Sequence, residues 1–520
     1  MKRRVVLINP KVCSPRSTRF PLSLLALAAV LEDRWQLDVV DGNFEADPAA
    51  RVRALLDQDD VALVGVTVMP GPQVAPAIAV STMVRRHAPR VPIAWGGYFP
   101  TLYPDAAINA PYVDFVVRGQ GEDTLLELLD RLDHDAGDGR RPADGLPASP
   151  GDARALAEVR GLTFRRAGEI VHNPDRPFRP PDTYPLYPYR RLPGATAYPR
   201  PSFLGARTVA HQAAIGCRFR CNFCGVVSMF NGYTDLQGPD RLDATLTTLR
   251  DEYAADSVQY YDHNFFDRED SSVATLEVLA RHRLPWWCFA RTDTLANFSP
   301  GTWKLIEKSG LRMTYLGAEA ASDDVLRTMK KGTKVEHTIA AARRCQEHGV
   351  IPELSFILGG PEDPEGEIER TFAFIRRLKA MVPACEIVLY FYSPTPQRDR
   401  ASRARDHDGA RILVLDTYGP GGEALPTTPE EWTERRWVDY TCHLDAPWLT
   451  PALRRRVQDF SKVLACRFPT VQDYHTPSWG KTMLKSLAGW RYATGWYGKP
   501  WELDVARRLV RLREPQRESL

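Results

Sequence analysis

CRFRCNFC, residues 217–224, places three cysteines in the spacing C-x3-C-x2-C. A short irregular loop lets the thiolates of Cys217, Cys221 and Cys224 wrap one inorganic cluster. Iron–sulfur clusters are normally held by four cysteine thiolates, and no further C-x2-C pair in the chain completes a tetrahedral zinc site. The spacing therefore predicts a [4Fe–4S] cluster with one iron left open for a substrate or cofactor. The alternatives are a zinc site with His211 as a distant fourth ligand, or buried cysteines without a metal.

The composition is that of an ordinary soluble protein with several domains. The 520 residues are enough for two to four domains with ample core. The chain has 68 Lys and Arg residues and 65 Asp and Glu residues. Its net charge is therefore too small to attract nucleic acid by itself. The longest apolar run, residues 22–31, is too short to span a bilayer, and we expect no integral membrane segment. The six cysteines outside the loop are scattered, as in a protein of the reducing cytoplasm.

Residues 1–150 alternate short apolar strands with helices. The predicted strands are residues 5–8, 37–40, 61–66, 91–95 and 112–117, and the predicted helices are residues 22–31, 48–57, 76–87 and 124–132. This alternation predicts a parallel, doubly wound, Rossmann-like sheet. Such sheets bind ligands at the carboxyl ends of their strands, which is where the Gly-rich turns of this segment lie.

The turns at these strand ends resemble the cobalamin-binding domain of cobalamin-dependent radical S-adenosylmethionine (SAM) enzymes. The matching pieces are PLSL at 21–24, TVM at 67–69, Gly-Gly at 96–97 with Pro100, and GQGE at 119–122. The resemblance implies that these turns hold cobalamin, because glycine lets the backbone approach a bulky ligand closely. The residues it assigns to cobalamin are Thr67, Met69, Gly96, Gly97, Gly119, Gly121 and Glu122.

One part of the cobalamin pattern is missing. The Asp-x-His-x-x-Gly motif that supplies a lower axial histidine is absent after the first strand, where residues 9–13 read NPKVC. We therefore expect no histidine on cobalt from this loop, and a lower face that is open or approached by a residue near Val68. A nucleotide-binding Rossmann domain or a domain that has lost its cofactor are the alternatives, although no G-x-G-x-x-G follows the first strand.

The cysteine loop, with Phe223 before its last cysteine, resembles the defining motif of the radical SAM superfamily. In that family the open iron chelates the amino and carboxylate groups of SAM. Strands are predicted at residues 208–215, 257–261, 286–290, 312–316, 353–358 and 386–391. These six units resemble the partial (β/α)6 barrel of the family, which we expect over residues 204–397. The cysteine loop follows the first strand, at the end of a barrel where chemistry takes place.

The other predicted strand ends carry polar groups and glycines. SAM needs partners for a cationic amine, a ribose diol and an adenine face. By resemblance, Gly317, Glu319 and the Asp262 region contact SAM, Arg291 is a candidate for its carboxylate, and the Gly359-Gly360 turn lies near the adenine. Our catalytic candidates are Asp262, His263 and Tyr392. The alternatives are helix caps or surface ion pairs for the charged residues, and a structural role for His263.

The segments outside these two domains are a connector and an aromatic tail. Residues 151–203 are expected to link the domains, and residues 398–520 to form a mainly helical domain. Seven of the twelve tryptophans lie in the tail. Aromatic residues at this density usually form a core or an interface. The alternative is a cap over the barrel that closes on a large apolar substrate or touches a membrane surface.

The resemblance implies a cobalamin-dependent radical SAM methyltransferase acting on an unactivated carbon or phosphorus centre. In that mechanism the reduced cluster cleaves SAM to a 5′-deoxyadenosyl radical, and methylcobalamin donates the methyl group. The cofactors would be a [4Fe–4S] cluster, SAM and cobalamin, with a small or lipid-like substrate and an electron donor such as flavodoxin or ferredoxin. An oxidative cyclase or rearrangement enzyme with the same cofactors, and a cobalamin or redox sensor without turnover, are the alternatives. Methylthiotransfer is disfavoured because the first domain lacks three cysteines for a second cluster.

Overall fold

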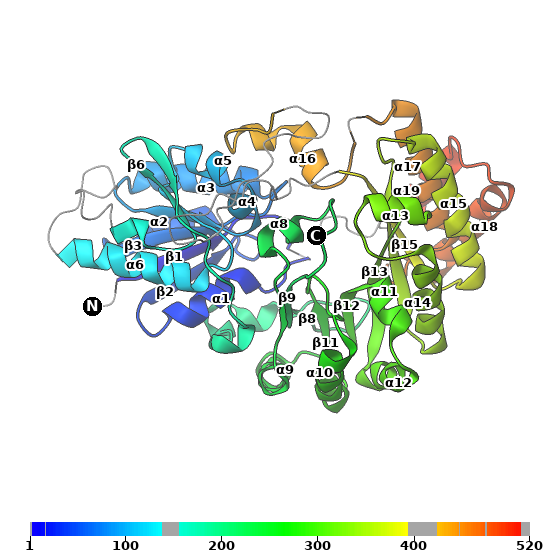
Figure 1. Cartoon of the computed structure of the whole chain (residues 1–520), viewed down its shortest axis with the longest axis horizontal. Coiled ribbons are helices and arrows are strands. Elements are labelled where there is room, and N and C mark those ends of the chain that lie inside the picture. Colours follow the sequence, from blue (N-terminus) through cyan, green and yellow to red (C-terminus); the bar gives the residue numbers. More distant parts are fainter. Residues whose placement is uncertain are drawn as a thin grey trace. The chain divides into compact units, whose positions relative to one another are not determined.

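The chain folds into two compact units (Figure 1). The computed structural model describes residues 3–15, 17–137, 155–393, 424–446, 448–473 and 476–510. Unit 1 contains the described residues of Met1–Tyr198, Ala214–Thr245 and Pro394–Cys442. Unit 2 contains those of Pro199–Ala213, Leu246–Ser393 and His443–Leu520. The expected domain boundaries at 150/151 and 397/398 lie outside the described residues, and the boundary at 203/204 stays a prediction.

Unit 1 is built on a seven-stranded sheet in the order β2-β1-β3-β4-β5-β6-β7. Its strands are β1 (Arg4–Asn9), β2 (Gln36–Asp41), β3 (Val61–Thr67), β4 (Ile93–Gly96), β5 (Phe115–Val117), β6 (Leu162–Arg166) and β7 (Glu169–His172). The first five are parallel, and β6 and β7 extend the sheet as an antiparallel hairpin. The expected doubly wound parallel sheet is confirmed.

Helices cover both faces of this sheet. Helices α1 (Leu22–Leu31) and α6 (Glu122–Gly137) pack together, as do α2 (Pro48–Leu56) and α3 (Val74–His87). Right-handed crossovers place the two pairs on opposite faces (Figure 1). The short helices α4 (Tyr98–Leu102) and α5 (Pro104–Asn109) follow β4 directly. The connector contributes three short 3-10 helices, η1 (Pro181–Thr183), η2 (Tyr189–Arg191) and η3 (Ala195–Ala197).

The cysteine loop lies inside a small hairpin of unit 1. Strand β9 (Ala214–Gly216) pairs antiparallel with β10 (Thr234–Leu236), and the chain between them contains the loop and α8 (Gly225–Phe230). The single strand expected at 208–215 is therefore wrong, because the chain breaks after His211 and its two halves join different sheets. Gly216 permits the tight entry into the loop: its φ is +71°, and a side chain there would collide with the Tyr233 carbonyl.

Unit 2 contains a six-stranded parallel sheet in the order β15-β14-β13-β12-β11-β8. Its strands are β8 (Thr208–His211), β11 (Ser257–Tyr260), β12 (Trp286–Arg291), β13 (Leu311–Glu319), β14 (Ile351–Leu358) and β15 (Glu386–Phe391). The intervening helices are α9 (Pro239–Tyr253), α10 (Glu269–His282), α11 (Thr292–Asn297), α12 (Pro300–Ser309), α13 (Asp323–Thr328), α14 (Val335–Glu347) and α15 (Pro364–Met381). This strand–helix alternation confirms the expected α/β fold.

The C-terminal segment is mainly helical, as expected, and divides between the units. It contains η4 (Glu431–Thr433), α16 (Arg435–Thr441), α17 (Pro451–Arg467), α18 (Ser478–Thr494) and α19 (Trp501–Val510). The aromatic residues of η4 and α16 join the core of unit 1, and α17–α19 form a cluster of their own in unit 2. Within the part of the chain that the structure describes, no helix is both long and apolar enough to cross a bilayer.

We expect Trp432→Ala to destabilise the protein by about 3–5 kcal/mol, the usual cost of removing a buried aromatic side chain. Trp432 is 2% exposed and its ring lies 4.1 Å from that of Tyr103. Urea unfolding followed by circular dichroism measures the change. Trp501 is 70% exposed, so Trp501→Ala is the control and should change stability by less than about 0.5 kcal/mol. Equal effects of the two substitutions would contradict the assignment of Trp432 to the core.

Candidate functional site

The three cysteines follow β9 and lead into α8. Cys221 is 7% exposed, whereas Cys217 and Cys224 are partly exposed. The loop is closed by a turn in which the Cys224 amide donates to the Cys221 carbonyl at 3.3 Å. Among the described residues, no three His, Cys, Asp or Glu side chains converge on the position of a single metal ion. A [4Fe–4S] cluster does not require such convergence, because each thiolate binds its own iron.

Tyr98 connects the cysteine loop with the predicted cobalamin turn. It follows Gly97 directly and begins α4, which packs against α8. Burial, followed by the thiolate charges of Cys224 and Cys217, raises the pKa of Tyr98 well above its usual value. The phenol therefore lies close to two of the three cysteines. The sequence analysis missed Tyr98, although an aromatic residue directly after the Gly-Gly pair was a usable signal.

The Gly-Gly turn brings the ends of β3 and β4 together. Gly97 has a φ of +96°, and a side chain there would come within 3.0 Å of the Thr67 hydroxyl and 3.1 Å of the Val68 carbonyl. The Val68 amide donates to the Gly96 carbonyl at 2.8 Å. The Thr67 hydroxyl also lies 3.4 Å from the hydroxyl of Ser23, at the start of α1. These predicted cobalamin residues therefore share one edge of the sheet, with backbone exposed where only glycine fits.

The loops after β1 and β3 are joined by a buried amide rather than by a histidine. Gln73, which is 2% exposed, accepts from the Met69 amide at 2.8 Å. Its Nε2 donates to the Asn9 side chain at 2.9 Å and to the Pro10 carbonyl at 2.7 Å. The Met69 side chain is exposed. The sequence carried no signal for Gln73, because two of its partners, Asn9 and Pro10, lie more than 60 residues away.

Gly119 lines a cavity of unit 1. Its amide donates to the Thr101 hydroxyl at 3.0 Å. The cavity has a volume of about 310 Å³ and is also lined by Arg118, by Phe178 of the connector and by Phe230 of α8. Residues of the predicted cobalamin domain, the connector and the cluster helix thus surround one space. Gly121 instead packs against α1, because a side chain there would meet Leu27 at 3.4 Å.

Glu122, the first residue of α6, has a carboxyl group with a raised pKa. Burial raises the pKa of its carboxyl from 4.5 to about 7, against the lowering effect of backbone amides at the helix start. The group therefore titrates near neutral pH. A carboxyl that is partly protonated at pH 7 can donate as well as accept a hydrogen bond.

In unit 2, Glu319 forms a buried ion pair with Lys331. The Lys331 ammonium donates to Glu319 Oε1 at 2.6 Å, and both side chains are 7% exposed. Glu319 Oε2 accepts from the Ser355 hydroxyl at 3.3 Å. A side chain at Gly317 would collide with both charged groups. The sequence analysis missed Lys331, which no motif marks.

The backbone of Glu319 is strained. Its φ is +64°, which is unfavourable for a residue with a side chain. The register between β13 and β14 shifts between Gly317 and Glu319, so the strand carries a bulge there. Bulges and left-handed residues cluster at functional sites, where the surrounding contacts maintain them. The ion pair with Lys331 supplies such a contact.

Arg291, at the end of β12, is held by its neighbours. Its guanidinium forms an ion pair with Asp293 at 2.9 Å and donates to the Lys331 carbonyl at 2.6 Å. Arg291 therefore supports the segment that carries Lys331. Its predicted role as a contact for the SAM carboxylate stays a prediction.

Asp262 and His263 follow β11. Asp262 is 1% exposed. Burial lowers the pKa of His263 to about 4, so its imidazole is neutral at pH 7. A neutral imidazole offers one donor and one acceptor nitrogen. The pair is thus placed at a strand end, as expected, and its catalytic role stays a prediction.

The Gly359-Gly360 turn after β14 is packed against the C-terminal segment. The Trp448 indole donates to the Gly359 carbonyl at 2.7 Å, and a side chain at Gly359 would come within 2.8 Å of Leu449. The Gly360 amide donates to the Glu367 carboxylate at 2.7 Å. Tyr392 follows β15, with its ring 6.1 Å from that of Trp448. Residues of the aromatic tail therefore lie at the ends of two barrel strands.

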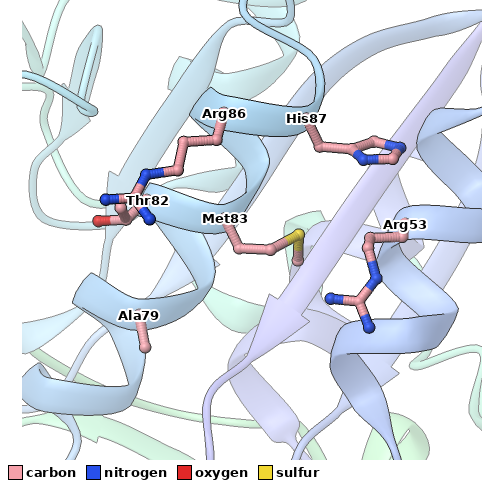
Figure 2. A pocket seen from close by; sticks show the side chains of 6 residues that line it. All are labelled: Arg53, Ala79, Thr82, Met83, Arg86 and His87. Carbon is pink, nitrogen blue, oxygen red and sulfur yellow. The ribbon is translucent and has the colours of Figure 1, made fainter.

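Another hollow of unit 1 lies away from these residues. Figure 2 shows the groove between α2 and α3, lined by Arg53, Ala79, Thr82, Met83, Arg86 and His87. It lies near the C-terminal end of α3, beside the amino ends of the parallel strands. The predicted cofactor turns follow the carboxyl ends. This groove therefore lies at the wrong edge of the sheet for the expected ligand site.

Two family models match the chain. The B12 binding domain model matches residues 13–129, and the Radical SAM superfamily model matches residues 213–375. An uncharacterized methyltransferase of Pyrococcus horikoshii is 25% identical over 366 residues, which cover 69% of this chain and 73% of the relative. The cytidylyl-2-hydroxyethylphosphonate methyltransferase of Streptomyces wedmorensis is 24% identical over 405 residues, with the same two coverages, 69% and 73%.

A solved structure shares the fold over almost the whole length. The radical SAM methyltransferase TsrM of Kitasatospora setae aligns with a TM-score of 0.62 at 18% identity, covering 98% of each chain. TsrM has been solved with tryptophan and a SAM analogue, and with cobalamin and a [4Fe–4S] cluster. At this identity the likeness shows the fold. It includes the C-terminal segment, which neither family model reaches.

We expect Glu122→Gln to stabilise the protein relative to wild type at pH 8 but not at pH 5. The folded-state pKa of about 7 lies above the usual 4.5. The carboxyl therefore contributes stability below pH 4.5 that is lost as the pH rises through 7. Thermal unfolding at both pH values measures the difference. Glu158→Gln, which removes an exposed carboxylate, should show no pH-dependent difference; if Glu122→Gln behaves the same way, Glu122 does not titrate near 7.

We expect Lys331→Met to destabilise the protein by about 3–5 kcal/mol, because it leaves the Glu319 carboxylate buried and uncompensated. The double variant Glu319→Gln/Lys331→Met should recover a large part of this loss. Chemical denaturation of the single and double variants closes a double-mutant cycle. Additive effects would mean that the two side chains do not interact energetically.

Proposed function

The chain belongs to the cobalamin-dependent radical SAM enzymes, and we propose that it is a methyltransferase. It places a methyl group on an unactivated carbon or phosphorus centre of a small molecule. The methyltransferase relatives and the fold shared with TsrM support this activity. When bound, the reduced cluster supplies the electron that cleaves SAM, and methylcobalamin supplies the methyl group.

The observation that carries the proposal is the position of Tyr98. It follows the Gly-Gly turn and begins α4, which packs against α8, the helix that starts directly after Cys224. The cobalamin turn and the cluster loop are therefore neighbours within one compact unit. A sensor that only binds cobalamin would not need a three-cysteine loop against its cofactor turn.

The residues of unit 1 suit the two cofactors by their chemistry. Cys217, Cys221 and Cys224 are thiolate ligands for three irons of a cluster. The Thr67 hydroxyl and the open backbone at Gly96-Gly97 suit the polar tail of cobalamin. Asn9 lies in the loop that would introduce a lower axial histidine, and the Gln73 amide bonds to its side chain and to the backbone of this loop. We therefore assign cobalamin a lower face without a histidine from this loop.

The residues of unit 2 suit SAM. Lys331 neutralises one oxygen of Glu319, while the other oxygen accepts only from the weakly held Ser355 hydroxyl among its described contacts. That second oxygen can accept a hydrogen bond from the SAM amine or ribose. The Gly359-Gly360 turn, which the resemblance assigns to the adenine, is held by Trp448 at the Gly359 carbonyl and by Glu367 at the Gly360 amide. The protein thus binds and orients SAM, and leaves the bond cleavage to the cluster.

The reaction needs a one-electron donor and a reducing compartment. We assign these roles to a flavodoxin or ferredoxin and to the cytoplasm. The substrate is a small or lipid-like molecule, and the part of the C-terminal segment beside Gly359 and Tyr392 is positioned to contact it.

We expect anaerobically reconstituted protein with cobalamin, reductant and SAM to release 5′-deoxyadenosine, and Cys221→Ala to abolish the release. Liquid chromatography with mass spectrometry measures the nucleoside. Cys466→Ala, which removes a buried cysteine of the C-terminal cluster in unit 2, is the control and should retain activity. Intact SAM under all conditions would exclude the enzyme and favour a sensor.

Deuterated-methyl SAM separates the two enzymatic alternatives on candidate substrates. Label in the product identifies methyl transfer. An unlabelled product formed together with 5′-deoxyadenosine would overturn the methyltransferase in favour of an oxidative cyclase or rearrangement enzyme.

A further inference from the structure

His443 occupies the end of β15 although it lies 52 residues further along the chain. Its carbonyl accepts from the amide of Phe391, the last residue of β15, at 3.0 Å. The backbone of His443 is in the left-handed region, with a φ of +54°. Non-glycine residues persist in this conformation only where surrounding contacts maintain it, and they concentrate at functional sites.

The Nδ1 atom of His443 is shielded from solvent, although the residue as a whole is only half-buried. Its Nδ1 has no hydrogen-bond partner among the residues that the structure describes. Burial lowers the pKa of His443, while a hydrogen bond from its ring to the backbone of Phe391 and the negative charge of Glu319 raise it. The ring therefore lies within electrostatic range of the carboxylate that we assign to SAM. A shielded nitrogen without a partner costs stability unless a ligand completes its hydrogen bonding.

The residues that follow His443 extend along the same strand ends. Trp448 bonds to the Gly359 carbonyl at 2.7 Å, and Leu449 packs against Gly359. Trp448 and Leu449 thus contact the glycine turn after β14, and His443 bonds to Phe391 at the end of β15. This segment lies outside both matched family models. Its polar groups therefore could not be assigned from the family motifs.

We propose that the His443 imidazole contacts SAM and that the segment around it completes the SAM site. The inference rests on the proposed function, since it takes SAM as the ligand of unit 2. Nδ1 supplies a hydrogen bond to a polar group of SAM beside the oxygen of Glu319 that Lys331 leaves available. The left-handed backbone of His443 aligns the ring with these strand ends. His443 is a binding residue in this arrangement and transfers no proton.

Two variants test the role of the ring. His443→Phe keeps an aromatic ring of similar size and removes both nitrogens. His443→Gly suits the left-handed backbone and removes the ring together with both nitrogens. Binding of radiolabelled SAM to the anaerobically reconstituted holoprotein is measured by equilibrium dialysis. Both variants should bind SAM about tenfold more weakly, as expected for one lost hydrogen bond, while their thermal unfolding midpoints stay close to wild type.

His348→Phe is the matched control. Its imidazole is stacked on Trp303 and paired with Glu307 at 3.1 Å, and it precedes β14, so it lies at the amino end of the strands. SAM affinity of this variant should equal that of wild type. Unchanged affinity in either folded His443 variant would overturn the inference while leaving the proposed function intact, and so would an equal loss in the control. If wild-type holoprotein does not bind SAM, the proposed function fails first.

Discussion

Parallel strand pairing is the constraint on which the functional residues depend. In both sheets all parallel strands end at one edge, so residues far apart in sequence become neighbours there. In unit 1 this brings Thr67 and Gly97 into contact and places Ser23 beside them. In unit 2 it brings Glu319, Ser355 and Gly359 to the ends of adjacent strands. The less regular parts of the chain lie near these strand ends: the cysteine hairpin in unit 1 and part of the C-terminal segment in unit 2.

The residues at these edges are unfavourable for stability. Glu319 combines a left-handed backbone with a buried charge, and each feature alone costs free energy. Lys331 offsets the charge, and Arg291 holds Lys331 through its carbonyl. Two further side chains thus keep one carboxylate in place. Binding sites are where such local costs persist, because the rest of the fold over-determines the geometry.

The strands and their ends could be predicted from sequence because their signals are local. Apolar runs such as residues 386–391 coincide with β15, and the run at 22–31 coincides with α1. Gly96-Gly97 marks the turn that the structure contains. Gln73, Lys331 and His443 could not be selected from sequence, because their contacts come from partners brought close by folding. The break of the strand at 208–215 was missed for the same reason: pairing with β10 decides it, and β10 lies beyond the cysteine loop.

The tryptophans of the C-terminal segment have different surroundings. Trp432 and Trp437 complete the core of unit 1, where Trp432 packs edge-on to Phe99. The indole nitrogen of Trp448 instead donates a hydrogen bond to the Gly359 carbonyl. Trp479, Trp490, Trp496 and Trp501 remain exposed. The density of tryptophan therefore does not mark one cap over the barrel. Among the described residues of the tail, His443, Trp448 and Leu449 are held at the ends of β14 and β15.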